Sequence, residues 1–173
     1  MPPNTSKPLR IVEYDAAWQA KFGAIGSQLR HELGSAALRI DHIGSTAVPG
    51  LPAKDLIDIQ ITIERLADAD EWPNGLLSGS LQRRAGDLDD HVPPLGSKVR
   101  ADWEKRYWSD RQRVHVHVRQ AGRANQRYAL LFRDFLRADP IAASAYGQLK
   151  AALALAVPDD WETYYAVKSP LVT

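Results

Sequence analysis

Residues 40–61 constrain the fold of this chain most strongly, because two apolar runs meet there at a glycine-serine turn. The first run ends at Gly44-Ser45, and a loop rich in proline and glycine follows it. Proline and glycine exclude a long helix in that loop. The second run, residues 56–63, alternates like a strand, with Asp58 and Gln60 on the face opposite the isoleucines. The segment therefore predicts two strands joined by a turn, with a polar face beside it.

Hydrophobic spacing predicts the remaining elements. Further strands are expected at residues 37–43, 106–109 and 113–119. Helices are expected at residues 15–34 and 124–138, from Asp139-Pro140 onward, and from 158–160 to Lys168. Short helical stretches are expected at residues 64–69 and 76–85, and residues 86–100 read as a mobile loop. Whether that loop closes over a ligand is left open.

Apolar residues gather on one side of each of two helices expected in the last third of the chain. In the first of these helices they are Tyr128, Leu131, Phe132, Phe135 and Leu136. In the second they are Ile141, Ala145, Leu149 and Leu153. The prediction is an α+β fold, with a mixed β-sheet flanked by helices and a helical C-terminal third.

The length and composition of the chain limit the classes of protein to which it can belong. We expect one domain over residues 1–173, with a flexible tail at 1–9 and a helical part at 122–168. The absence of cysteine excludes disulfides and thiolate metal sites, and no stretch reads as a membrane span. A net charge of +1 gives no strong signal for nucleic acid. A cytoplasmic location is expected.

The turn and the strand after it carry residues suited to phosphate and metal. Backbone N–H groups at Gly44, Ser45 and Thr46 can donate to phosphate oxygens, since glycine permits close approach. Asp58 stands among isoleucines, where a carboxylate must be paired or bound to metal. The structural alternatives are a capped turn, and an aspartate bonded to loop backbone or to arginine.

Two histidines lie on one face of the strand at 113–119. His115 and His117 alternate with valines and are flanked on their own face by Arg113 and Arg119, which predicts a surface that faces an anion. The alternative is a half-exposed strand face under a helix. Lys54 and Lys168 are further candidate phosphate contacts. The patterns of P-loop kinases and of serine hydrolases with a nucleophile elbow are both absent from the sequence.

Together these segments resemble the GrpB family, a group with a nucleotidyltransferase-like fold. The specific part is the run His-Ile-Gly-Ser-Thr-Ala-Val-Pro-Gly-Leu at residues 42–51. Weaker matches are Tyr14-Asp15 with Trp18, Lys54 with residues 57–59, residues 115–118 and residues 132–137. The resemblance implies that Gly44 and Ser45 hold nucleotide phosphates and that Asp58 is the first metal carboxylate. Relatives also occur fused to dephospho-CoA kinase.

The chain departs from the wider superfamily at its metal ligands. Where a second carboxylate is expected the sequence has Gln60, whose amide oxygen can ligate a cation without charge. At the strand where a third carboxylate is expected, the sequence has His115 and His117. Asp55 replaces a proline of relatives, and its offset from Asp58 directs it to the other face of the strand.

Three functional hypotheses follow. The first is a metal-dependent nucleotidyltransferase-like or ligase-like enzyme acting on a nucleotide or phosphorylated small molecule. Its cofactors are Mg²⁺ or Mn²⁺ and a nucleoside triphosphate, with Asp58, Gln60 and His117 as metal ligands and His115 or His117 as ligand or general base. The second is a non-catalytic module that binds a nucleotide or CoA-like ligand. The third is a domain whose helical third docks on another protein. The oligomeric state stays open.

Overall fold

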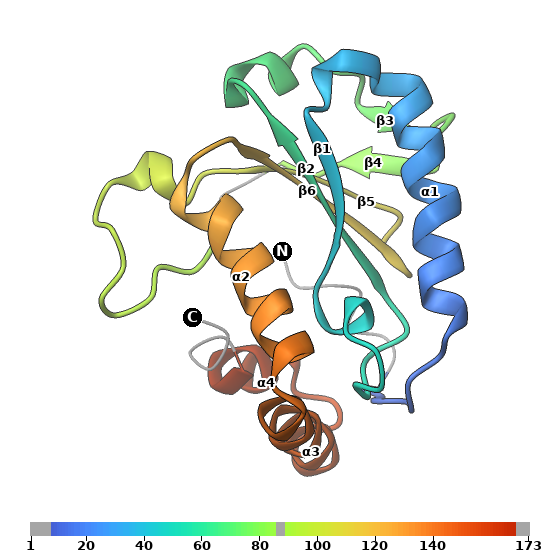
Figure 1. Cartoon of the computed structure of the whole chain (residues 1–173), viewed down its shortest axis with the longest axis vertical. Helices are drawn as coiled ribbons and strands as arrows, with labels where there is room; N and C mark the ends of the chain where they lie inside the picture. Colours follow the sequence, from blue (N-terminus) through green and yellow to red (C-terminus); the bar gives the residue numbers. More distant parts are fainter. Residues whose placement is uncertain (1–7, 86–88, 169–173) are drawn as a thin grey trace.

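The computed structural model describes residues 8–85 and 89–168, and places one six-stranded sheet between helices (Figure 1). The strands are β1 (Arg39–Ile43), β2 (Ile57–Ile63), β3 (Gly75–Leu76), β4 (Leu81–Arg83), β5 (Arg106–Ser109) and β6 (Val114–Gln120). They lie in the order β1-β2-β6-β5-β4-β3. Only the β2–β6 pair is parallel. The mixed sheet of an α+β fold is confirmed.

The described residues form four α-helices. They are α1 (Ala17–Leu33), α2 (Ala124–Ala138), α3 (Pro140–Ala156) and α4 (Trp161–Lys168). Asp15 accepts a hydrogen bond from the N–H of Ala17 at 2.8 Å at the start of α1, and Gly34 ends that helix with a φ of 53°. Asp139 caps α3 by accepting from two backbone N–H groups. The expected helical C-terminal third is confirmed.

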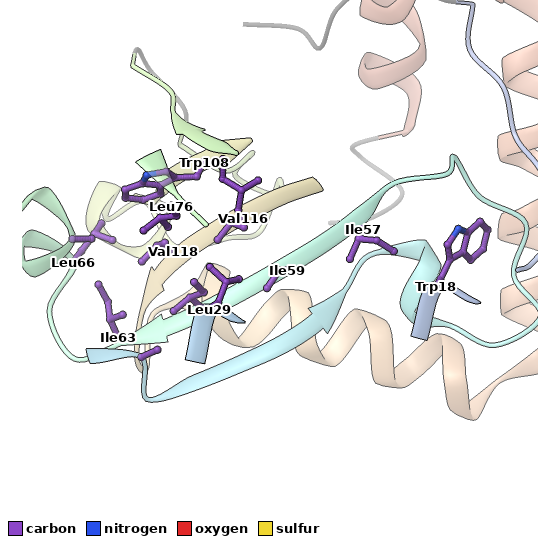
Figure 2. Close-up of a cluster of buried hydrophobic side chains, with 14 of the residues drawn as sticks. Trp18, Leu29, Ile57, Ile59, Ile63, Leu66, Leu76, Trp108, Val116 and Val118 are labelled. Carbon is purple, nitrogen blue, oxygen red and sulfur yellow. The ribbon is translucent and has the colours of Figure 1, made fainter. Parts of the chain in front are cut away.

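The apolar face of the sheet packs against α1 and forms the main core (Figure 2). The four isoleucines of β2 are at most 3% exposed, and Val116, Val118 and Trp108 are fully buried. Trp18 and Leu29 bring α1 into the same cluster. Because side chains alternate along a strand, the polar residues of β2 and β6 lie on the opposite face, on the side of α2.

The helix predicted at residues 76–85 is wrong. The chain instead forms the short hairpin β3–β4, in which Leu76 pairs with Leu81. Three consecutive residues in its turn, Leu77, Ser78 and Gly79, have φ between 53° and 87°, which a right-handed helix does not allow. The stretch at 64–69 is a single 3₁₀ turn, Leu66–Asp70.

The apolar stripes of α2 and α3 only partly coincide with the faces that are buried. In α3 the buried residues are Tyr146, Gly147, Lys150 and Ala154, whereas Ile141 is 83% exposed. Gly147 sets this face, since a Cβ there would lie 3.2 Å from both Leu51 and Pro52. In α2, Phe132 and Leu136 pack inward, but Leu131 and Phe135 are exposed.

Leu9, which the sequence places in a flexible tail, is packed against the C-terminal helices. Leu9 is buried against Ala154 and Tyr164, and its N–H donates to the carbonyl of Pro158 at 2.7 Å. Residues 1–7, and 86–88 of the predicted loop, lie outside the described residues. No helix in the described part of the chain is long and apolar enough to cross a membrane.

Candidate metal and phosphate site

The parallel register of β2 and β6 brings a carboxylate and two imidazoles together. Asp58 lies opposite His115 in the register, and His117 is the next residue on the same face of β6. Oδ1 of Asp58 lies 3.4 Å from Nδ1 of His115 and 3.5 Å from Nε2 of His117. The three ligand atoms lie within 4.8 Å of one another. This group, Asp58, His115 and His117, is called the triad below.

Opposing influences act on the charge of the triad. Burial favours the protonated form of Asp58, but the hydrogen bonds and charges of His115 and His117 outweigh it, so the pKa of Asp58 lies well below its ordinary value. Burial, with the positive charge of Lys105, lowers the pKa of His117 to about 4 despite the opposing effect of Asp58. At neutral pH the triad therefore has an ionised carboxylate and a neutral His117, the forms that bind metal.

Gly44 lies directly against the Asp58 carboxylate. Its φ of 72° and ψ of −173° are in a region that only glycine adopts readily. A Cβ at this position would lie 2.5 Å from Oδ2 of Asp58. Ser45 begins a 3₁₀ turn, Ser45–Ala47. The glycine-serine turn thus borders the triad, as the sequence predicts.

Thr46 and His42 hold the turn from within. The Thr46 hydroxyl donates to the carbonyl of Leu56 at 2.9 Å and lies 3.0 Å from Nε2 of His42. His42 stacks on Phe22 of α1, with ring centroids 4.8 Å apart. The hydroxyl of Thr46 is therefore occupied by structural contacts.

Two arginines of α2 fix the turn from outside. Arg133 donates to the carbonyl of His42 at 3.0 Å. Arg137 donates through two nitrogens to the carbonyl of Ala47, at 3.0 and 2.7 Å. Segment 132–137, one of the matches to the family, therefore holds the turn against α2 through these two arginines.

Gln60 is engaged away from the triad. Its side-chain oxygen accepts from Arg119 at 2.6 Å, and its side-chain nitrogen donates to the carbonyl of Gln126 at 3.0 Å. Arg119 also forms a bidentate ion pair with Asp90, which in turn contacts Lys105 and Asn125. Gln60 and Arg119 therefore both belong to a buried polar network, and their hydrogen bonds are made within that network and not to the triad.

Arg113 and Asp55 lie apart from these groups. Arg113 is largely exposed and pairs with Asp55 at 3.0 Å. Asp55 also accepts from the indole of Trp18 at 2.9 Å, which ties β2 to α1. The expectation that Asp55 faces away from Asp58 agrees with these contacts.

A cavity of about 320 Å³ opens between the triad and the C-terminal helices. Gly44, Ser45 and the triad line its sheet side. Lys54, Lys150 and Lys168 line the side formed by the β1–β2 loop, α3 and α4, together with Tyr146, Tyr164 and Tyr165. Of the residues predicted to bind a cofactor, Gly44, Ser45, Thr46, Lys54, Arg119 and Lys168 line this cavity, and Arg113 does not.

Sequence reasoning missed Lys150, Asp90 and the tyrosines of the cavity. The one available signal for Lys150 is that it is the single charged residue in a mostly apolar helix. Asp90 had no signal, since its partner Arg119 is 29 residues away. The role of Arg137 could be suspected only from the motif that contains it.

The fold and site define a small α+β protein with a carboxylate and two imidazoles in a cavity on the polar face of a mixed sheet. The family model for the GrpB protein matches residues 8–173, and the chain belongs to the GrpB family. The crystal structure of the conserved protein GrpB from Enterococcus faecalis superimposes with a TM-score of 0.71 at 28% identity, covering 94% of each chain.

Curated relatives fall into two groups. A dephospho-CoA kinase of Mycolicibacterium paratuberculosis is 39% identical over 94% of this chain, but the match spans 44% of the kinase. A UPF0157 protein of Streptomyces coelicolor is 31% identical, with 94% of this chain and 79% of the relative covered. The chain therefore spans less than half the length of such kinases.

Proposed function

We propose that this protein is a metal-dependent enzyme of the nucleotidyltransferase or ligase type, acting on a nucleotide or another phosphorylated small molecule. The observation that carries the proposal is the triad beside the glycine-serine turn, within a cavity of small-molecule size. Phosphoryl chemistry depends mainly on positioning and charge stabilisation, and the cavity offers both.

The donor set of the triad fits a divalent cation. Asp58 and one of the two imidazoles provide an oxygen and a nitrogen, a mixed donor set that suits Mn²⁺ or Zn²⁺ better than Mg²⁺, an ion that prefers oxygen ligands. Of the two ions expected from the sequence, Mn²⁺ is thus favoured. A bound cation would supply positive charge to a phosphoryl oxygen of the substrate.

The surrounding residues have separate roles in this proposal. N–H groups of the turn at Gly44 and Ser45 hold phosphate oxygens, with a nucleoside triphosphate as the expected donor. Lys54 and Lys168 offset the charge of the ligand from the opposite wall. Whichever of His115 and His117 does not ligate the metal accepts the proton of an attacking hydroxyl or amine. Matching regions in proteins named dephospho-CoA kinase support a nucleotide-like ligand.

Turnover measurements test this proposal. Incubation with nucleoside triphosphates and Mn²⁺ or Mg²⁺ should release product, and Asp58→Asn and His117→Ala should abolish that release. The matched controls are Asp68→Asn and His31→Ala, which change residues outside the cavity. Full activity in Asp58→Asn would exclude the mechanism.

Gln60 favours a second candidate, a non-catalytic module for a nucleotide or CoA-like ligand. The position of the second carboxylate carries an amide whose oxygen and nitrogen are both bonded within the protein. A two-metal centre therefore lacks a ligand there. This candidate expects the same affinity for nucleotides with and without EDTA, measured by calorimetry, and no turnover.

A further inference from the structure

Lys54, Lys150 and Lys168 come from three different elements and meet on one wall of the cavity. Lys54 lies in the loop between β1 and β2, Lys150 lies in α3, and Lys168 ends α4. Lys150 is 2% exposed. Neither Lys54 nor Lys150 forms an ion pair with a carboxylate anywhere in residues 8–85 and 89–168.

Neutral groups hold these ammonium groups instead. Lys150 donates to the carbonyl of Pro52 at 2.7 Å and lies 4.7 Å from the ring centroid of Tyr146. Lys54 donates to the hydroxyl of Tyr165 at 2.8 Å, and the rings of Trp161, Tyr164 and Tyr165 lie 4.6 to 5.3 Å from it. Carbonyls and aromatic faces stabilise a cation but do not neutralise it.

The lysines also act on one another. Burial lowers the pKa of Lys54 to about 7, and the charge of Lys168 adds to that effect, while the charge of Asp58 acts in the opposite direction. Burial has the same effect on Lys150, with further contributions from Lys168 and Lys54. An unpaired buried charge is costly unless a partner of opposite sign arrives. The protonated lysines of this wall therefore lack a counterion unless an anion binds.

We infer that Lys54, Lys150 and Lys168 form an anion subsite that receives a terminal phosphate of the ligand, separate from the metal triad in the same cavity. Tyr165 accepts from Lys54 and keeps its own hydroxyl proton for an oxygen of that phosphate. The inference deepens the proposed function by dividing the cavity into two ends. Its lysine end needs no metal, so it can be tested alone.

Sulfate is a suitable probe, because it is a tetrahedral dianion that does not titrate near pH 8. Calorimetry in EDTA at constant ionic strength should detect sulfate binding to the wild-type chain. Lys54→Met and Lys150→Met should each raise the Kd at least tenfold, and Asp58→Asn should leave it unchanged or lower. The matched control is Lys98→Met, which removes an exposed lysine outside the cavity.

Two further readouts separate an anion subsite from a structural role. At pH 8 the heat of binding should depend on the buffer, because sulfate draws protons onto Lys54 and Lys150. Without sulfate at pH 6, where Lys150 is protonated, Lys150→Met should melt at the same temperature as the wild type or higher, because removing the unpaired charge outweighs losing the hydrogen bond to the carbonyl of Pro52. Lys168→Met, at the partly exposed end of α4, provides a variant without a buried substitution and should also weaken binding.

Several results would overturn the inference. They are no sulfate binding by the wild type, unchanged affinity in the lysine variants, or loss of binding in Asp58→Asn. A lower melting temperature of Lys150→Met with unchanged sulfate affinity would assign that lysine a structural role only. Sulfate binding that follows the expected pattern without any turnover would leave the subsite standing and remove the proposed catalysis alone.

Discussion

Gly44 shows how one residue determines the geometry of the candidate site. Its backbone conformation excludes other residues, and the space for its side chain is filled by the carboxylate of Asp58. The glycine thus sets how closely the turn approaches the triad. The positive φ of Gly44 and the nearness of Asp58 are visible only in the folded chain. The sequence motif identifies the glycine but gives neither reason for it.

Substitution of Gly44 tests this close approach. Gly44→Ala should lower the free energy of unfolding by roughly 2–4 kcal/mol, through backbone strain and displacement of Asp58. Binding of Mn²⁺ should weaken in parallel. Gly50→Ala is the matched control, because Gly50 also has a positive φ, 78°, but open space around its Cβ position. It should cost about 1 kcal/mol. Equal losses in both variants would mean that the carboxylate contact is unimportant.

His42 should make stability depend on pH. Burial, with the charges of Arg137 and Arg133, lowers the pKa of His42 to about 4 against the pull of Asp58. The unfolded chain then binds more protons between pH 6.5 and pH 4, so stability falls as pH falls through this window. His42→Gln should reduce the loss between pH 7.5 and pH 4.5 by about 2–3 kcal/mol.

Denaturant unfolding at the two pH values measures this difference. His31→Gln is the control, since it removes an exposed histidine of α1. A pH dependence of His42→Gln that matches the wild type would show that His42 is not held neutral in the fold.

At the scale of elements, α2 positions the glycine-serine turn through Arg133 and Arg137. The carbonyl of Ala47 accepts both hydrogen bonds of Arg137, and Ala47 is fully buried. Arg137→Met should therefore destabilise the protein by about 1–3 kcal/mol, because that carbonyl loses its partner. The affinity for Mn²⁺ should fall as the turn loosens. Arg127→Met, on the exposed side of the same helix, should change neither, and equal effects of the two variants would argue against a clamp.

The sequence predicted elements whose pattern is local. Alternation identified β2 and β6, and their parallel pairing then brings Asp58 to His115. The inward face of α3 could not be predicted, because apolar residues cover most of that helix. Its true face depends on Gly147, which packs on a loop far away in the sequence.

The same reasoning explains which site residues were predicted. The triad lies on two strands with clear periodicity, so its residue types and faces were readable. Lys150 reaches the carbonyl of Pro52, 98 residues away, and no local pattern marks such a contact. Gln60 was expected near a metal, but its partners come from β6 and α2, which the sequence does not place next to it.

At the scale of the whole molecule, the sheet separates an apolar half from a polar half. Figure 1 shows α1 on one face of the sheet and α2 on the other, with α3 and α4 beyond one end. The cavity lies on the polar side, where burial of charge must be balanced by pairing. Asp90 provides that balance by joining the segment after residue 88 to β6 through Arg119, and to β5 through the adjacent Lys105.

Asp90→Asn tests whether this pairing holds the polar half together. Burial opposes ionisation of Asp90, but the charges of Arg119 and Lys105 prevail and keep its pKa well below the ordinary value. Loss of the carboxylate leaves two buried cations without their counterion, so unfolding should become easier by about 3–5 kcal/mol. Asp89→Asn, next in sequence, breaks a pair with the exposed Arg100 and should cost less than about 1 kcal/mol. Similar midpoints of urea unfolding for the two variants would show that the network contributes little to stability.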